Sequence, residues 1–202
     1  MKFKNTAVYN IEGALRGMRN PLSSWERSDS GWRDGVFVIG EADLILARKL
    51  IAGGTEHRKF MRQIFVSVDI TAPIYWWSEF DTYKVGTAAN STSTMHTLAK
   101  HPITPDMFEC DNPCIDGDEK YWRELCEDLE LLRKKYNETK DYAYFRSLKQ
   151  RLPSAFLQTR TVSLNYEVIV NMLRQRKNHR LREWSKDFTD WTKSLPYQEL
   201  IT

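Results

Sequence analysis

The sequence predicts an α+β fold, a helix-rich single domain over residues 1–202 with a small, mainly antiparallel sheet. Two observations lead to this prediction. Apolar residues recur at helical spacing in most of the patterned segments, whereas only two or three segments alternate as strands do. No glycine-rich phosphate-binding motif follows either of the clearer strands, which disfavours a doubly wound nucleotide-binding sheet.

Composition indicates a soluble globular protein, with 41% hydrophobic and 28% charged residues. The formal net charge of +3 is too small for the strong field of a dedicated nucleic-acid binder. No apolar run approaches the roughly 20 residues that cross a bilayer, and the first residues lead into no signal-peptide core. We therefore expect a cytoplasmic protein without a membrane partner.

Helices are expected where apolar residues share one face and capping or breaking residues bound the segment. The clearest runs over residues 41–52, because Gly53 and Gly54 supply a stop after its apolar face. The last two segments form either two helices or one bent helix. The expected helices cover residues 5–18, 41–52, 71–84, 118–136, 142–151, 165–175 and 180–193.

Strands are expected over residues 63–71 and 156–164. In the first, Ile64, Val66, Val68 and Ile70 alternate with more polar residues, which is typical of a strand with one buried face. The second is rich in Thr, Val and Phe. Small polar residues, Pro, Asp and Gly predict loops over residues 22–35, 86–94 and 101–117.

The three cysteines lie close together in the sequence, at Cys110, Cys114 and Cys126. An odd number of cysteines disfavours a secreted disulfide framework. The spacing of Cys110 and Cys114, with His101 upstream, could serve zinc, but structural zinc sites need four ligands and no second pair is present. We expect incidental thiols in a loop and no metal.

An aromatic segment, residues 75–84, offers the first candidate site. On a continuous helix Tyr75, Glu79 and Tyr83 would share one face, and Asp81 could pair with Lys84. A glutamate between aromatic rings can have its pKa raised by desolvation, which suits a base or a ligand contact. The alternative is a core face of tryptophans with Glu79 solvated at its edge.

A run of small hydroxyl residues offers a second candidate, from Asn90 through Ser91, Thr92 and Ser93 to Thr94. Such a run can hold a phosphate through its hydroxyls and backbone amides. A solvated loop is the alternative, because turns favour the same residues.

The third candidate is a helical stripe that is apolar where it begins and polar where it ends. Arg160, in the strand before it, adds a guanidinium suited to phosphate or a pyrimidine edge. A salt-bridge network of Arg176 with Glu183 is the alternative. The stripe comprises Asn165, Ile169, Met172, Arg176, His179 and Glu183.

Taken in order, these pieces resemble the flavin-dependent thymidylate synthase family. Residues 13–20 (GALRGMRN) are similar to its first helix, and residues 65–75 (FVSVDITAPIY) to its strand and Ala-Pro lead-in. Thr159 and Arg160 resemble its Thr-Arg strand, and residues 165–184 its late helix. The family's Arg-His-Arg triplet aligns with Thr82-Tyr83-Lys84, and its later Ser-x-Arg segment with the run from Asn90 to Thr94.

The resemblance implies methylation of dUMP to dTMP, with reduced FAD as hydride donor and with methylene-tetrahydrofolate and NADPH as co-substrates. It implies a homotetramer whose sites form between subunits. Arg176 would be the catalytic residue that polarises the pyrimidine. The implied substrate-binding residues are Arg160, Glu79, Ser91, Thr92 and Ser93, and the implied cofactor-binding residues are Thr82, Tyr83, Lys84, Asn90, Asn165, Asn171 and His179.

Two other functions stay open. The chain could be a non-catalytic protein that binds a pyrimidine nucleotide or a flavin on the same scaffold, which the changed triplet favours. A nucleic-acid or structural interaction protein would use the basic residues 133–135 and 174–182, but such runs are usually solvated helix faces. We therefore expect a small nucleotide, and no nucleic acid, as the partner.

Overall fold

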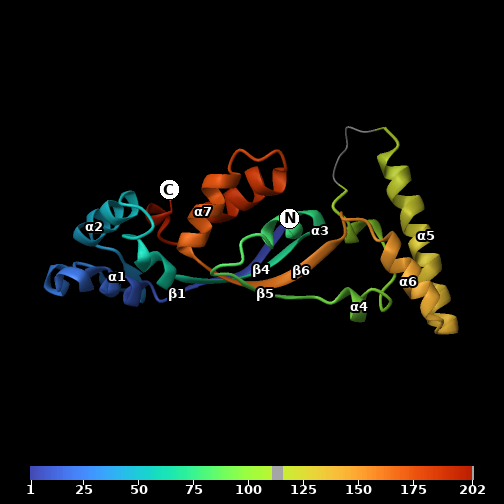
Figure 1. Cartoon of the computed structure of the whole chain (residues 1–202), viewed down its shortest axis with the longest axis horizontal. Helices are drawn as coiled ribbons and strands as arrows, with labels where there is room; N and C mark the ends of the chain where they lie inside the picture. Colours follow the sequence, from blue (N-terminus) through green and yellow to red (C-terminus); the bar gives the residue numbers. More distant parts are fainter. Residues whose placement is uncertain (111–115, 202) are drawn as a thin grey trace. The chain divides into compact units, whose positions relative to one another are not determined.

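The computed structural model describes residues 1–110 and 116–201 (Figure 1). Their internal contacts divide the chain into two compact units. Unit 1 comprises residues 1–2, 70–82 and 90–160, and unit 2 comprises residues 3–69, 83–89 and 161–202. Each strand of the larger sheet contributes residues to both units.

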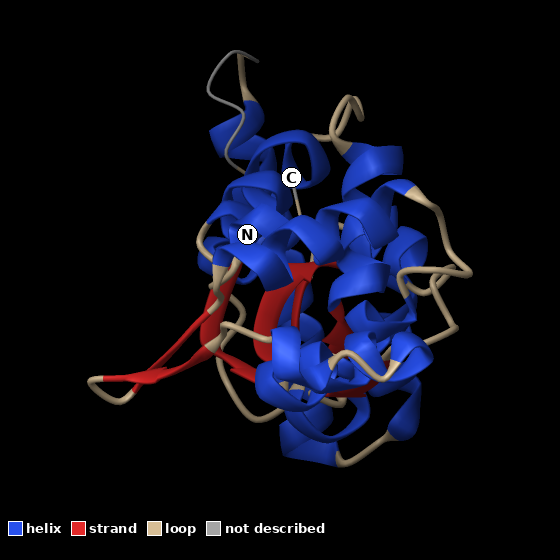
Figure 2. Ribbon diagram, turned by 90° about the vertical axis from the view of Figure 1, so that its left-hand side faces the viewer, coloured by secondary structure: helices blue, strands red, loops and turns tan. Residues whose placement is uncertain are grey.

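The larger sheet has four strands in the order β1-β4-β6-β5, so β1 and β5 are its edges. These strands are β1 (Lys2–Tyr9), β4 (Phe65–Pro73), β5 (Ala88–Ser91) and β6 (Leu157–Asn165). A second sheet is the antiparallel hairpin of β2 (Gly31–Arg33) and β3 (Val36–Val38). Helix makes up most of the regular structure (Figure 2). The predicted helix-rich α+β fold with a small antiparallel sheet is confirmed.

The central strands follow the predicted pattern. Val66, Val68 and Ile70 of β4 are almost completely buried, and Ile64 just before the strand is too. The strand runs to Pro73, whose backbone is extended and which serves as the N-cap of α3 (Ile74–Phe80). β6 covers nearly the residues predicted for the second strand.

The edges of the sheet were not predicted. Residues 5–9, expected as the start of a helix, belong to β1, and α1 (Ile11–Arg19) begins only after Asn10, which adopts the left-handed conformation. Residues 88–91, expected as loop, form β5. The expected loop 22–35 contains β2 and the short 3-10 turn Trp25–Arg27, and it begins at the end of another 3-10 turn, Asn20–Leu22. In both edge strands, pairing with a strand distant in sequence decides the structure, and a local pattern does not record such pairing.

Several helices match their predicted bounds. α2 (Glu41–Ala52) and α6 (Tyr142–Arg151) begin and end where expected, and α5 runs from Asp118 to Thr139. α3 is shorter than the expected helix 71–84 at both ends, because residues 71–73 belong to β4 and the helix ends at Phe80. α7 (Tyr166–Arg176) is followed by a separate π-helix (Glu183–Phe188) and α8 (Thr189–Lys193), so the C-terminal residues do not form one bent helix. Short helical turns complete the chain: α4 (Thr94–Thr97), η3 (Lys59–Gln63), η4 (Pro105–Met107) and η6 (Gln198–Leu200).

Unit 1 has an apolar core between α5, α6 and the segments that precede them. Aromatic rings from distant segments meet there, since Phe108 stacks on Trp122 and meets Phe156 edge to face. The core residues are Leu98, Ile103, Phe108, Cys126, Leu129, Leu148 and Phe156. Among the described residues, no helix combines the length and apolar composition that a membrane crossing requires.

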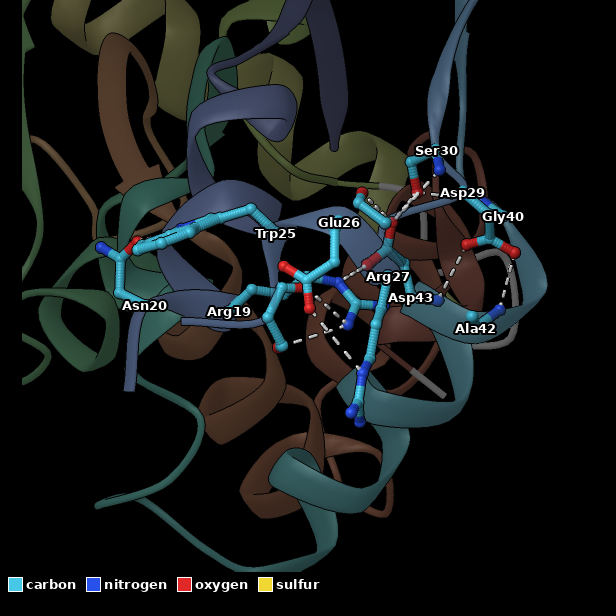
Figure 3. Close-up of polar contacts among 12 residues, drawn as sticks. Arg19, Asn20, Trp25, Glu26, Arg27, Asp29, Ser30, Gly40, Ala42 and Asp43 are labelled. Carbon is cyan, nitrogen blue, oxygen red and sulfur yellow. Dashed lines mark hydrogen bonds and ion pairs between the residues drawn. The ribbon is translucent and has the colours of Figure 1, made fainter. Parts of the chain in front are cut away.

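Unit 2 contains a buried carboxylate that ties three segments together (Figure 3). Asp43, in the first turn of α2, is completely buried and accepts hydrogen bonds from Arg19 of α1 and from the hydroxyls of Ser28 and Ser30. A buried charge is tolerated only when such partners replace its water. The start of α2 is therefore fastened to α1 and to the loop before β2.

The same loop caps α2 from outside the helix. Asp29 accepts hydrogen bonds from the backbone N–H groups of Ala42 (2.8 Å) and Asp43 (3.1 Å). This requires Gly40, because a Cβ there would lie 2.1 Å from Asp29 Cγ. A side chain at position 40 would displace the cap.

We predict that Asp43 makes stability depend on acidity. Burial alone raises its carboxyl pKa, but hydrogen bonds from Ser28, Ser30 and Arg19 outweigh it, so the pKa of Asp43 lies below its usual value. The ionised carboxylate therefore stabilises the fold above the unfolded pKa of about 3.9, and this stabilisation is lost as pH falls through the lower folded pKa. Asp43→Asn should cost about 3 kcal/mol at pH 7 because Arg19 stays buried without a charged partner. The unfolding free energy of the variant should also fall less than that of the unchanged protein as the pH drops below about 4.

Urea denaturation from pH 7 to pH 2 measures both effects. Glu41→Gln, an exposed change in the same helical turn, is the control and should cost less than about 1 kcal/mol. An Asp43→Asn variant as stable as the control at pH 7 would contradict the prediction.

Candidate functional site

The residues predicted for the site fall in both units. Unit 1 holds Arg160, Glu79, Ser91, Thr92, Ser93, Thr82 and Asn90, and unit 2 holds Arg176, Tyr83, Lys84, Asn165, Asn171 and His179.

In unit 2, Arg176 lies at the last position of α7 against two aromatic rings. Its Nε donates a hydrogen bond to the hydroxyl oxygen of Tyr83 (2.9 Å), and that hydroxyl donates to Gln175 Oε1 (2.9 Å). Its guanidinium carbon lies 5.6 Å from the ring centre of Tyr83 and 5.2 Å from that of Trp184. Such cation–π contacts favour a guanidinium that stays against the two rings. Arg176 is therefore a positioned, half-buried cation.

The segment that contains Tyr83 continues along α7 to the start of that helix. Gly86, with φ at +80°, brings the backbone so close that a Cβ would lie 3.0 Å from Asn165 Nδ2 and from Val168 Cγ2. Asn165 is the N-cap of α7, because its Oδ1 accepts from the Val168 N–H (3.1 Å). A cavity of about 320 Å³ opens here. It is lined by Thr55, Arg62, Val85, Gly86, Asn165, Glu167, Val168 and Asn171.

A buried ionic cluster borders this cavity and was not predicted. Glu167 of α7 is 3% exposed and accepts hydrogen bonds from Arg58 Nε (3.1 Å) and from Arg62 Nε. The hydrogen bond to Glu167 raises the pKa of Arg62. Arg58 also donates to Asn171 Oδ1 (3.0 Å), which links the cluster to a predicted cofactor residue. One feature of the sequence could have indicated this cluster. Glu167 lies inside the apolar run of residues 166–170, and a glutamate that is buried there needs a charged partner.

In unit 1, Arg160 of β6 also contacts both a polar side chain and an aromatic ring. Its Nη1 donates to Asp81 Oδ1 (2.7 Å), and its guanidinium carbon lies 4.2 Å from the ring centre of Trp77. The predicted pairing of Asp81 with Lys84 is wrong, since Asp81 pairs with Arg160 and the exposed Lys84 lies in the other unit. A guanidinium attracts the carboxylate better than a flexible ammonium does, because it bonds in a fixed planar geometry.

The hydroxyl run continues the sheet and does not form the predicted loop. Asn90 and Ser91 are exposed residues of β5, and Thr92 extends the pairing by donating its N–H to Thr159 O (2.9 Å). The Thr92 hydroxyl donates to the same carbonyl (3.2 Å), and Ser93 caps α4 with its backbone. Pairing with β6 thus uses the backbone N–H of Thr92, one of the groups expected to hold a phosphate.

Two shared helical faces that the sequence predicted do not form. α3 ends before Tyr83, so Tyr83 does not continue the face of Tyr75 and Glu79. The C-terminal stripe ends at Arg176, because α7 stops there and Glu183 belongs to the π-helix. His179 lies in the connection, where its Nδ1 accepts from the Leu181 N–H (3.2 Å).

Metal ligands do not cluster in residues 1–110 and 116–201, where no group of three or more His, Cys, Asp or Glu could hold a metal ion. Cys126 is buried, and Cys110 Sγ donates a hydrogen bond to Pro105 O (3.5 Å). Cys114 lies outside the described residues.

No protein-family model and no curated protein sequence matches the chain. Solved structures do match its backbone over its whole length. A flavin-dependent thymidylate synthase, ThyX, from Helicobacter pylori, complexed with FAD and dUMP, has a TM-score of 0.72 and 18% sequence identity, with 100% of this chain and 98% of that chain covered. The fold is that of flavin-dependent thymidylate synthases. A second structure of the Helicobacter pylori enzyme with FAD and dUMP also has a TM-score of 0.72, at 19% identity, covering 100% of this chain and 97% of that chain.

We predict that the cluster around Glu167 is a major stabilising element of unit 2. Glu167→Gln should lower the unfolding free energy by about 3 kcal/mol, because the buried Arg58 loses its charged partner. Thermal and urea denaturation measure the loss. Glu138→Gln, the same substitution in an exposed ion pair with Lys135, is the control and should change stability by less than about 0.5 kcal/mol. Equal effects of the two substitutions would refute the prediction.

Proposed function

We propose that the protein is a divergent flavin-dependent thymidylate synthase that methylates dUMP to dTMP. Methylene-tetrahydrofolate would supply the one-carbon unit, and bound reduced FAD, regenerated by NADPH, would supply the hydride. The observation that carries the proposal is the orientation of Arg176 by Tyr83 and Trp184, at the position that the family resemblance assigns to catalysis.

The role proposed for Arg176 is to bind and polarise the pyrimidine. A guanidinium donates hydrogen bonds in a fixed plane, which suits the carbonyl edge of a uracil ring. These bonds withdraw electron density from the ring and make C6 a better hydride acceptor. The rings of Tyr83 and Trp184 hold the guanidinium before the nucleotide arrives, so less ordering entropy is lost on binding.

The cavity at the start of α7 suits one ring system of the flavin cofactor. Its volume of about 320 Å³ lies at the small end of ligand pockets, which span roughly 300–1,000 Å³. Asn171 and Arg62 supply hydrogen-bond donors at its wall, and Gly86 leaves the space that a Cβ would fill. We assign this cavity to part of the FAD, held by Asn165, Asn171 and Arg62.

The remaining predicted roles belong to the same proposal. Tyr83 acts as a positioning residue for Arg176, and Arg160 with Ser91, Thr92 and Ser93 contributes to nucleotide binding. A homotetramer with sites shared between subunits and a cytoplasmic location complete the proposal, as the resemblance and the sequence indicate.

A non-catalytic protein that binds a pyrimidine nucleotide or a flavin is the second candidate. It is favoured by Arg160, which is paired with Asp81, and by Thr92, whose N–H pairs with β6. Groups already satisfied within the fold gain less from a phosphate than unpaired ones do. Weak nucleotide binding without turnover would follow.

We predict that the purified protein keeps a flavin absorbance spectrum after incubation with FAD and removal of the unbound FAD by gel filtration. Addition of dUMP should then change that spectrum. With reduced flavin and methylene-tetrahydrofolate present, dTMP should form. Arg176→Ala should reduce dTMP formation by about tenfold to a hundredfold, the effect of losing one charged hydrogen-bond donor. Chromatography of the nucleotide products measures it.

Arg174→Ala is the matched control, since Arg174 is an exposed residue of the same helix, and it should leave turnover unchanged. Binding of FAD and dUMP without any dTMP would support the non-catalytic candidate. Absence of both binding and turnover would reject both candidates.

A further inference from the structure

A second cavity, away from every predicted site residue, lies in unit 2 between α1 and the β2–β3 hairpin. Its volume is about 250 Å³. Its lining comes from α1, from the loop that follows α1 and from the hairpin. The lining residues are Glu12, Leu15, Arg16, Arg19, Trp25, Ser28, Ser30, Gly31, Trp32 and Phe37.

Two tryptophans at this cavity are unusually exposed. Trp25 is 50% exposed and Trp32 is 63% exposed, whereas Trp76, Trp77 and Trp184 are completely buried. Folding therefore does not use these two rings as core. Large exposed aromatic rings beside a hollow are typical of ligand sites, because they offer broad contact area for little conformational entropy.

Both indoles are held in place by hydrogen bonds. Trp25 Nε1 donates to Asn20 Oδ1 at 2.9 Å (Figure 3), and Trp32 Nε1 donates to Glu12 Oε2 at 3.1 Å. Trp32 also meets Phe37 edge to face at 5.6 Å, since the hairpin register places them opposite each other. Binding would therefore cost little ordering of these rings.

The cavity also presents two opposite charges that do not pair with each other. Glu12 and Arg16 stand four residues apart on α1, a spacing that allows an ion pair, yet Glu12 bonds to Trp32. Arg16 is exposed and makes no hydrogen bond or ion pair within the described part of the chain. The other arginine of the lining, Arg19, is neutralised by Asp43 beneath the cavity. A ligand thus meets one carboxylate and one unpaired guanidinium beside aromatic walls.

We propose that this cavity binds a small planar aromatic ligand that carries both an anionic group and an amine N–H donor. The ring stacks on Trp25 and Trp32, the anion pairs with Arg16, and the amine donates to Glu12. An aromatic amino acid and an adenine mononucleotide share this chemistry. The site is separate from the proposed thymidylate synthase site, because none of the residues assigned to that site lines it.

Isothermal titration calorimetry at low salt tests the proposal with two probe pairs. L-phenylalanine is compared with 2-phenylethylamine, which lacks the carboxylate, and AMP with adenosine, which lacks the phosphate. At least one anionic probe should bind. Its Kd should be about tenfold lower than that of the matched compound without the anionic group, because that compound loses a charged hydrogen bond. Binding of L-phenylalanine alone identifies an amino-acid site, and binding of AMP alone a nucleotide site.

Variants locate the binding. Arg16→Gln should weaken it about tenfold, and Trp25→Leu should weaken it and reduce the quenching of tryptophan fluorescence by the ligand. Arg48→Gln, the same charge change at an exposed position of α2 outside the cavity, should have no effect. Arg16 is exposed, so its replacement should leave the thermal midpoint unchanged.

Three outcomes would overturn the proposal. The first is no binding of either anionic probe at about 10 mM, a concentration that would nearly saturate a site with a Kd of about 1 mM. The others are equal binding within each probe pair and an affinity that Arg16→Gln does not change. The Arg176→Ala variant distinguishes binding in this cavity from binding at the proposed thymidylate synthase site. Binding that Arg176→Ala abolishes and Arg16→Gln leaves intact would belong to the nucleotide site and would also overturn the proposal.

Discussion

Glu167 is the constraint on which most of unit 2 depends. Its buried carboxylate joins α7 to Arg58 and Arg62, from a segment more than a hundred residues earlier in the chain. Buried charge is costly unless every partner is in place, so the cluster admits one arrangement of α7 and rejects others. Because Asn165 caps the start of α7 and Arg176 is its last residue, that arrangement also sets where the proposed cofactor and substrate residues stand. Stability and site geometry therefore rest on the same carboxylate.

The two arginines proposed to contact the nucleotide are positioned in similar ways in separate units. Each guanidinium lies against an indole ring, Arg160 against Trp77 and Arg176 against Trp184. Each also donates a hydrogen bond to a neighbouring side chain, Arg160 to Asp81 and Arg176 to Tyr83, so two kinds of contact limit its orientation. The tryptophans that composition alone marks as core residues thus also act as supports for polar chemistry.

Prediction from sequence succeeded where the information is local. The bounds of α2 and the alternation in β4 are set by neighbouring residues. α2 has the predicted bounds, and β4 buries the predicted residues although it runs over 65–73 and not 63–71. The strand β1 was missed because its structure depends on pairing across the sheet. The resemblance to flavin-dependent thymidylate synthases led to the right fold, but the partners of Arg58 and Arg62 lie over a hundred positions away and no spacing rule reaches them. Which of the proposed residues meet a ligand stays a prediction.

The edge strand β5 has a consequence for the behaviour of the protein in concentrated solution. An edge strand offers its outer backbone groups to any other extended chain, and long apolar edges promote aggregation. β5 is only four residues long, and its Ala-Ala-Asn-Ser sequence is exposed throughout and has weak strand propensity. Such an edge is a poor template for a neighbouring molecule. Asn90 and Ser91, which the sequence marked as part of a possible phosphate loop, therefore also disfavour the pairing of this edge of the sheet with another molecule.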